Sequence, residues 1–136
     1  MEAFIWPVRV YYEDTDSGGV VYYANYLKFM ERARTEWLRA RGFEQDALLR
    51  DRRLLFAVRR LAVDYHRPAR FNDRLEVVSQ VAETGGASLT FAQTIRRAGS
   101  TELLCGARVK VACIDAESFQ ACRMPQDLMR EMIGDA

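Results

Sequence analysis

The sequence predicts a single domain of the α+β class, in which one long helix covers one face of an antiparallel sheet. Two observations support this class: one amphipathic helical pattern stands near the N-terminus, and four strand patterns joined by short turns fill the second half. An antiparallel sheet needs cover on one face, and a long amphipathic helix provides it. No repeat, linker or low-complexity stretch divides the 136 residues, so we expect one domain over residues 1–136.

The first strand is expected over Val8–Glu13, where side chains alternate with the period of two that is typical of a half-buried strand. Trp6-Pro7 is where we expect this strand to begin. The polar residues 14–19 follow, and their composition is typical of a turn.

The longest helical pattern runs from Tyr22 to Arg41 and ends at Gly42, because glycine readily adopts the left-handed conformation that closes a helix. Apolar residues at steps of three and four predict one buried stripe. Its members are Tyr22, Tyr26, Phe29, Met30, Ala33, Trp37 and Ala40. The opposite face carries Lys28, Glu31, Arg32, Arg34, Glu36 and Arg39. A helix so apolar on one side must lie against a sheet.

Residues 44–53 are expected to add a helical turn or two before the strands begin. The first strand pattern, over residues 54–65, has one apolar parity that Arg59 interrupts, and Pro68 follows its end. Its apolar members are Leu55, Ala57, Leu61, Val63 and Tyr65.

Strand patterns over residues 74–83 and 87–97 flank Gly85-Gly86 and predict a hairpin. The last pattern, over residues 101–115, alternates inward and outward positions. Its inward members are Ala107, Val109, Val111 and Cys113, and its outward members are Arg108 and Lys110. Pro125 is expected to open a short C-terminal helix.

Composition excludes several functions. With 20 basic and 19 acidic side chains, the net charge of +1 provides no long-range field for nucleic acid or for an anionic membrane. The single histidine, His66, is the only candidate base for a histidine-dependent hydrolase, and we expect it to be solvated or structural. We therefore expect no nucleic-acid partner and no ordinary zinc site.

The cysteines Cys105, Cys113 and Cys122 match no metal-knuckle spacing, so we expect reduced thiols. No window approaches the roughly 20 apolar residues of a transmembrane helix, and the N-terminus lacks the features of a signal peptide. These features predict a cytoplasmic protein.

The most unusual stretch is residues 11–22, which places Glu13, Asp14 and Asp16 just ahead of the predicted helix start. Unpaired N–H groups and the helix dipole make a helix start a place where an oxyanion can be held. The paired glycines in this stretch let the backbone approach a ligand closely. A carboxylate beside such a site can attack a carbonyl or deprotonate a water, which is acyl-transfer chemistry.

The same stretch has a plainer interpretation, in which Asp14, Asp16 and Ser17 serve only as turn and N-cap residues. A calcium loop fits less well, because Gly18 and Asn25 stand where ligands are needed. No serine elbow and no glycine-rich phosphate loop occurs in the chain. From spacing alone, the turn and the acyl-transfer site both remain open.

Residues 7–42 resemble the hotdog-fold acyl-CoA thioesterases, and within them the Tol-Pal-associated branch of the 4-hydroxybenzoyl-CoA thioesterase family. Two segments, YEDTDSGGVVYYANY (residues 12–26) and ERARTE (residues 31–36), carry the likeness. It continues through Arg59, the segment from Tyr65 to Asp73 with its Pro68-Ala69-Arg70, and Ser88-Leu89, so it covers nearly the whole chain.

The resemblance implies a hotdog fold, a five-stranded antiparallel sheet wrapped around one long central helix, paired into homodimers or homotetramers with sites at the dimer interface. It implies that Asp16 is the catalytic carboxylate, as nucleophile or as base for water, and that the backbone N–H of Tyr23 polarises the thioester carbonyl. The residues expected to bind substrate are Gly19, Val20, Val21, Tyr22, Asn25, Arg59 and Ser88.

The expected substrate is an acyl-CoA or an acyl-carrier-protein thioester, with no separate cofactor, because coenzyme A is part of the substrate. Its phosphates call for basic side chains. Arg59 is the favoured candidate because it matches a basic position of the branch, and Ser88 is a weaker one. The other arginines near strand ends are expected to be solvated: Arg60, Arg67, Arg70, Arg96 and Arg97.

One position departs from the branch, whose members usually carry histidine where this chain has Tyr23. A backbone donor survives a side-chain change, so a thioesterase remains the leading hypothesis. The missing imidazole favours the alternative, a non-catalytic acyl-CoA or acyl-carrier-protein binding module of an envelope-associated complex. A hotdog dehydratase fits less well, because that chemistry calls for an acid/base histidine.

Overall fold

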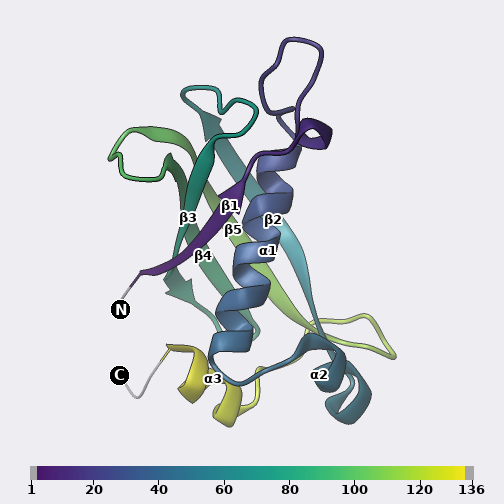
Figure 1. Cartoon of the computed structure of the whole chain (residues 1–136). Coiled ribbons are helices and arrows are strands. Elements are labelled where there is room, and N and C mark those ends of the chain that lie inside the picture. Colours follow the sequence, from purple (N-terminus) through teal and green to yellow (C-terminus); the bar gives the residue numbers. More distant parts are fainter. Residues whose placement is uncertain (1–2, 134–136) are drawn as a thin grey trace.

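The computed structural model describes residues 3–133, which form one curved antiparallel sheet packed on a long helix (Figure 1). The strands are β1 (Phe4–Arg9), β2 (Leu54–Tyr65), β3 (Arg74–Thr84), β4 (Ser88–Arg97) and β5 (Leu103–Asp115), in the spatial order β1-β3-β4-β5-β2. The helices are α1 (Asn25–Ala40), α2 (Gln45–Arg52) and α3 (Gln126–Ile133). All four strand pairings are antiparallel.

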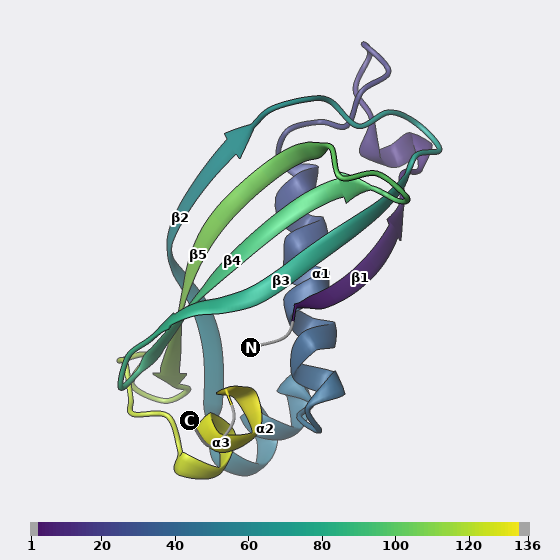
Figure 2. The same ribbon diagram turned by 90° about the vertical axis from the view of Figure 1, so that its left-hand side faces the viewer.

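The sheet curves around α1, as Figure 2 shows. The loop between β1 and α1 lies at one end of the molecule, and α2 and α3 lie at the other (Figure 1). This arrangement confirms the predicted α+β class and the sheet of five strands wrapped around a central helix. None of the helices within residues 3–133 is long and apolar enough to cross a membrane.

Two groups of buried side chains form the core. The first surrounds the N-terminal half of α1 and includes Tyr26, Phe29 and Met30. The second surrounds Trp37 and joins the far ends of the strands to α2 and α3. The predicted stripe is therefore buried at Tyr26, Phe29, Met30, Ala33 and Trp37.

A buried polar network ties α1 to the sheet. Gln93, on β4, is fully buried, and its amide donates to the Met30 carbonyl at 3.0 Å and to Ser79 Oγ at 2.9 Å. Arg34 Nη1 donates to Gln93 Oε1 at 2.9 Å. Arg34 is therefore half-buried between α1 and the sheet, and its predicted place on the solvated face of the helix is wrong.

The first strand lies earlier than predicted. β1 spans Phe4–Arg9, so Pro7 lies inside it, paired with Glu76. Proline is tolerated there because β1 is an edge strand. After Val10 the chain turns, because the Tyr11 N–H donates to the Asp14 carboxylate at 2.8 Å and closes a short 3₁₀ turn.

The long helix begins three residues later than predicted, at Asn25 instead of Tyr22. Tyr22 and Ala40 are exposed, so their places in the buried stripe are wrong. Gly42 follows the helix with φ of +93°, as predicted for its end.

Strand β2 has the predicted bounds but not the predicted inward face. A bulge shifts its register between Val58 and Arg60, and Arg59 is the extra residue. β2 is also an edge strand, and Ala57, Leu61 and Tyr65 are exposed. The interrupting arginine was thus the sequence signal of a bulge.

The remaining elements agree with the sequence. The β3–β4 hairpin, the inward and outward positions of β5, and the helix after Pro125 are all confirmed. The three cysteines are free thiols; Cys105 and Cys113 are buried and Cys122 is half-buried.

Candidate active site

The loop that carries Asp16 is a small hairpin. Thr15 pairs with Val21, and the Asp16 N–H donates to the Val20 carbonyl at 2.9 Å. The exposed Asp16 carboxylate accepts the Gly18 N–H through Oδ1 at 2.8 Å, which is an Asx turn. Asp16 is therefore the turn residue that sequence spacing suggested, and it is also the residue whose carboxylate the family resemblance implies is catalytic.

Glycine is required at one position of this hairpin. Gly19 has φ of +78°, a conformation that side chains with a Cβ rarely adopt. Its N–H donates to the Asp16 carbonyl at 3.0 Å and completes the tight turn. Gly19 thus shapes the loop around the carboxylate.

A second loop, between β2 and β3, holds this hairpin against the body. The Val21 N–H donates to the Ala69 carbonyl at 2.8 Å, and Val20 pairs with Arg70. Val21 is buried in the core, while Val20 is half-buried. Both valines therefore anchor the hairpin, and Val21 offers no surface to a substrate.

The same loop is fixed to α1 by Tyr26. The buried hydroxyl of Tyr26 accepts the Ala69 N–H at 2.9 Å. One backbone unit of Ala69 is thus joined to the hairpin and to the helix, which sets their relative position.

The start of α1 directs one backbone donor outward. The Tyr22 carbonyl accepts the Asn25 N–H at 2.8 Å, so it points toward the helix. In a trans peptide the N–H points opposite to the carbonyl, and the Tyr23 N–H therefore points away from the helix. Within residues 3–133 the structure gives it no acceptor.

Asn25 joins the helix to the loop. Its side-chain amide donates to the Asp14 carbonyl at 2.8 Å, and the Tyr22 N–H donates to the same oxygen at 3.0 Å. The Asn25 amide nitrogen is therefore engaged in holding the loop.

Aromatic side chains surround the helix start. The Tyr22 and Tyr23 rings lie 4.7 Å apart, and both are largely exposed. A side-chain hydrogen bond with Tyr23 raises the pKa of Tyr22, and burial raises the pKa of Tyr65. Both phenols are therefore neutral at pH 7 and can serve as hydrogen-bond donors.

Arg59 and Ser88 lie apart from this loop within one chain. Arg59 sits at the bulge in the middle of the edge strand β2. Ser88 begins β4 next to Leu89, whose side chain packs in the second core cluster, at the α2 and α3 end. One copy of the chain therefore does not gather all the predicted substrate contacts.

Several of the other basic candidates are engaged elsewhere. Arg96 pairs with Glu76 at 3.0 Å, and Arg97 pairs with Asp73 at 3.2 Å. Arg67 lies 3.8 Å from Glu102, and His66 is exposed. Over residues 3–133, no group of three or more His, Cys, Asp or Glu side chains could hold a metal ion.

Two hollows lie side by side between α1 and β2, with volumes of about 230 and 250 Å³. Both are lined by Glu31, Arg34 and Val58. One includes Leu27 in the first turn of α1, and the other reaches Trp37. Together they follow the helix from its start toward its end.

A family model described as the thioesterase-like superfamily matches residues 10–132. The chain belongs to this superfamily. An acyl-CoA thioester hydrolase of Escherichia coli, YbgC, is 48% identical over 128 residues, which cover 94% of each chain. The acyl-CoA thioesterase YbgC of Haemophilus influenzae is 48% identical over 92% of this chain and 90% of its own.

Solved structures of other members have the same fold. A probable thioesterase from Bartonella henselae superposes with a TM-score of 0.85 at 35% identity, covering 91% of this chain and all of that one. A 1,4-dihydroxy-2-naphthoyl-CoA thioesterase from Synechocystis superposes with a TM-score of 0.89 at 24% identity, over 96% of both chains, which supports the fold alone. The predicted hotdog fold is confirmed.

Sequence reasoning missed the residues that hold this superfamily member's loop in place. Ala69 contacts the hairpin and Tyr26, and Tyr65 contacts Tyr23. Both lie in the segment from Tyr65 to Asp73 that carried part of the family resemblance, which was the available signal.

Proposed function

We propose that this chain is an acyl-CoA thioesterase that hydrolyses a thioester to a free acid and coenzyme A. The observation that carries the proposal is the outward-pointing Tyr23 N–H at the start of α1, beside the hairpin that holds Asp16. Membership of the thioesterase-like superfamily and the acyl-CoA thioesterase names of the YbgC relatives support the same activity. The motif resemblance of residues 7–42 is also the basis on which we propose that the chain belongs to the Tol-Pal-associated branch.

In the proposed mechanism, the thioester carbonyl accepts a hydrogen bond from the Tyr23 N–H. The Asp16 carboxylate either attacks the carbonyl carbon or takes a proton from a water that attacks it. In both routes negative charge develops on the carbonyl oxygen, where a fixed N–H stabilises it. The carbon–sulfur bond then breaks, and coenzyme A departs as a thiolate that needs no strong general acid. When water is the nucleophile, this step gives the free acid directly. When Asp16 is the nucleophile, it leaves a mixed anhydride with the Asp16 carboxylate, which a water then hydrolyses to the free acid and the regenerated carboxylate.

Asp16 fits both routes. One carboxylate oxygen, Oδ1, holds the Gly18 N–H, while Oδ2 accepts no hydrogen bond from residues 3–133. The bound oxygen fixes the orientation of the carboxylate, and the other is available for the reaction. Aliphatic acyl groups would enter the hollows between α1 and β2, which begin at Leu27.

A second copy of the chain would complete the site. β2 has one unpaired edge of 12 residues and exposes Val58 and Leu61, with exposed fractions of 50% and 40%. An apolar unpaired edge of this length favours pairing with another strand. We propose a homodimer or homotetramer in which Arg59 and Ser88 reach the phosphates of coenzyme A bound to a neighbouring copy.

No separate cofactor is proposed, because coenzyme A arrives with the substrate, and an acyl carrier protein could present the same thioester. The three free thiols fit a reducing compartment, so we propose a cytoplasmic location. Light scattering tests the assembly: a molar mass equal to one chain of 15.7 kDa would contradict the shared site.

Asp16→Asn tests the mechanism against a panel of acyl-CoA thioesters, with thiol release as the readout. We expect kcat to fall by at least about 100-fold, because the amide is neither a base nor a nucleophile. Glu13→Gln is the matched control, since it makes the same change to an exposed carboxylate in the same loop. A folded Asp16→Asn variant with undiminished kcat would refute the proposed mechanism.

The alternative is a non-catalytic binding module for acyl-CoA or acyl carrier protein in an envelope-associated complex. Tyr23, which stands where the branch usually has histidine, favours it. Calorimetric titration of the unmodified chain distinguishes the two. Tight binding of acyl-CoA without thiol release over the whole panel selects the binding module.

A further inference from the structure

We propose that the hydroxyl of Tyr65 is a positioning group for the thioester site, because it fixes the backbone on which the Tyr23 N–H is displayed. Tyr65 itself need not touch the reacting atoms. This inference rests on the proposed thioesterase function and adds a residue from a different part of the fold to it.

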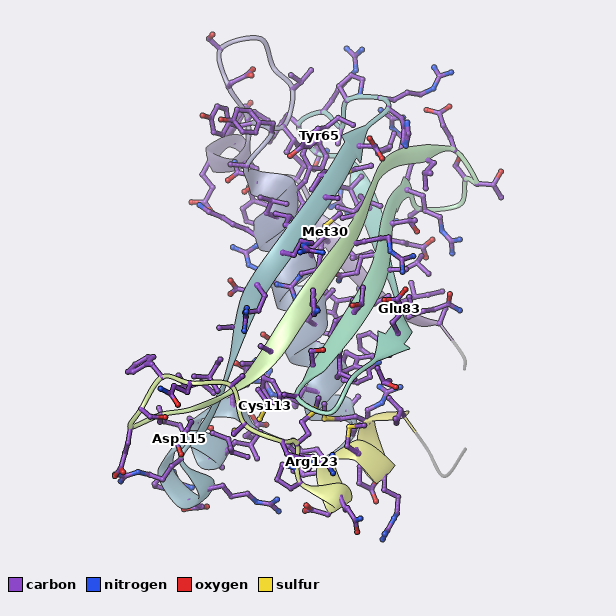
Figure 3. All side chains as sticks on the ribbon, turned by 180° about the vertical axis from the view of Figure 1, so that it is seen from behind. Met30, Tyr65, Glu83, Cys113, Asp115 and Arg123 are labelled. Atoms are coloured by element: carbon purple, nitrogen blue, oxygen red, sulfur yellow. The ribbon has the colours of Figure 1, made fainter. Side chains whose placement is uncertain are left out.

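The contact is a single hydrogen bond across 42 residues of sequence. Tyr65 is the last residue of β2, and its hydroxyl donates to the Tyr23 carbonyl at 2.9 Å. Figure 3 shows Tyr65 at the end of β2 that lies beside the start of α1. The bond therefore connects the sheet to the residue just before the helix.

The Tyr23 carbonyl needs this donor because the helix does not use it. The Leu27 N–H, which could have reached it, donates to the Ala24 carbonyl at 3.2 Å instead. Tyr65 is the only donor that the described part of the chain gives to this carbonyl. Without the hydroxyl, the peptide between Tyr23 and Ala24 would lose the one hydrogen bond that residues 3–133 provide to it.

Two clamps then set the conformation of Tyr23. The peptide before it is held by the Asn25 N–H on the Tyr22 carbonyl, and the peptide after it is held by the Tyr65 hydroxyl. Each peptide is planar, so holding both planes fixes the two backbone angles of Tyr23. The Tyr23 N–H lies in the first of these planes, and the bond from Tyr65 ties that plane, through the Cα of Tyr23, to the end of β2.

Ring packing keeps the hydroxyl of Tyr65 in place. Its ring meets the Tyr26 ring at 5.5 Å and 63°, and the Tyr23 ring at 6.4 Å and 81°. These are edge-on contacts between aromatic rings, a favourable arrangement. Phenylalanine at position 65 would keep all of this packing and remove only the oxygen, which separates positioning from packing.

The test compares purified wild type, Tyr65→Phe and the control Tyr12→Phe on the acyl-CoA that wild type hydrolyses fastest. Tyr12 lies in the loop before Asp16, and its hydroxyl makes no hydrogen bond within residues 3–133. We expect kcat of Tyr65→Phe to fall about tenfold with KM within twofold of wild type, the effect of losing one orienting hydrogen bond. Tyr12→Phe should match wild type in both constants.

A second measurement reads the oxyanion site directly. Two analogues that cannot be hydrolysed are titrated: a trifluoromethyl ketone, whose tetrahedral adduct with water or with the Asp16 carboxylate places an oxygen where the oxyanion forms, and a thioether that has no carbonyl. Because interactions made only in the transition state are the ones at issue, Tyr65→Phe should weaken the ketone about tenfold and leave the thioether unchanged. Equal weakening of both analogues would assign Tyr65 a merely structural role and overturn the proposal.

The outcomes of these measurements distinguish a failure of the positioning role of Tyr65 from a failure of the proposed thioesterase function. If wild type hydrolyses no thioester, the proposed function fails and the inference fails with it. If wild type is active and Tyr65→Phe retains kcat within twofold, the thioesterase stands and the positioning role is overturned. Urea unfolding of each variant shows whether a fall in kcat reflects loss of the folded state.

Discussion

Replacing Gln93 with methionine is expected to lower the free energy of unfolding by about 3 kcal/mol. Gln93 is fully buried and takes part in three hydrogen bonds, two to α1 and one to Ser79 on β3. Methionine has nearly the same volume, so packing is retained and the polar contacts alone are removed. Each lost hydrogen bond contributes about 1 kcal/mol, which gives the total.

Urea unfolding at 25 °C, followed by circular dichroism, measures this change as a shift in midpoint at constant slope. Gln120→Met is the matched control, because Gln120 is exposed, and we expect a change within about 0.5 kcal/mol. A double-mutant cycle with Ser79→Ala isolates the shared bond. The double variant should be about 1 kcal/mol more stable than the sum of the single effects predicts, because that bond is lost only once.

Two results would refute this reasoning. A loss below about 1 kcal/mol in Gln93→Met would mean that the network contributes little beyond what water offers the unfolded chain. Strict additivity in the cycle would mean that Gln93 and Ser79 do not interact. A full effect would instead identify Gln93 as a polar contact that sets the position of α1, and hence of the site at its start.

Further predictions concern the loops and thiols. Gly19→Ala should cost about 1 kcal/mol in urea unfolding because of its φ of +78°, whereas Gly106→Ala, with no positive φ and no atom within 4 Å of an added Cβ, should stay within about 0.5 kcal/mol of wild type. The backbone N–H groups of Ser118 and Glu117 lower the pKa of Asp115 below its ordinary 3.8, so this carboxylate favours folding above that pH and the benefit is lost as the pH falls. Asp115→Asn, which keeps an acceptor oxygen, should therefore show a shallower loss of stability than wild type between about pH 5 and pH 3; an unchanged slope would exclude the contribution. Burial raises the pKa of Cys105 to about 11 and of Cys113 to about 12, so iodoacetamide at pH 8 should label Cys122 first, and mass spectrometry showing early labelling of Cys113 would contradict the buried thiol.

Local pattern predicted best the hairpin whose two strands are neighbours in sequence and the helix whose apolar stripe identifies it without reference to its partners. The β3–β4 hairpin follows from alternation on both sides of Gly85-Gly86, and α1 follows from one apolar stripe. The predicted bounds of the first strand were wrong, because the alternation of apolar and polar side chains continues past Arg9 to Tyr12. The backbone pairing of this strand with β3 ends at Arg9. Only the distant partner strand decides where such a strand ends.

The candidate site also has one part that sequence spacing predicts and another part that only the folded structure reveals. Asn25, where α1 begins, is only nine residues after Asp16, so sequence spacing alone was enough to predict a carboxylate near a helix start. The contacts that hold them come from Ala69 and Tyr65, more than 40 residues away. Sequence spacing carries no information on such contacts, and the family resemblance marked the segment without assigning its role.

Tyr23 stands where the family resemblance leads us to expect histidine, and it can contribute to the site in two ways, through its side chain and through its backbone N–H. The peptide planes on both sides of Tyr23 are held by Asn25 and Tyr65, and neither bond involves the Tyr23 side chain. We therefore expect Tyr23→Ala to retain kcat within about fivefold, because the Tyr65 ring keeps its closer contact with the buried Tyr26 when the Tyr23 ring is removed. Tyr23→Pro removes the N–H itself, and we expect kcat to fall about 100- to 1,000-fold, as for loss of one oxyanion donor.

Proline at position 23 can be compared directly with alanine, because the two variants differ at a backbone N–H that the fold of residues 3–133 does not use. The Tyr23 N–H has no acceptor in the described part of the chain, so the substitution by proline removes no hydrogen bond of the fold. Urea unfolding of Tyr23→Pro should therefore give a midpoint close to that of Tyr23→Ala. If both variants fold and lose kcat equally, the side chain carries the function and the backbone donor does not. If Tyr23→Pro alone is inactive, the carbonyl is polarised by the backbone, and the activity does not need the histidine that the family resemblance led us to expect at this position.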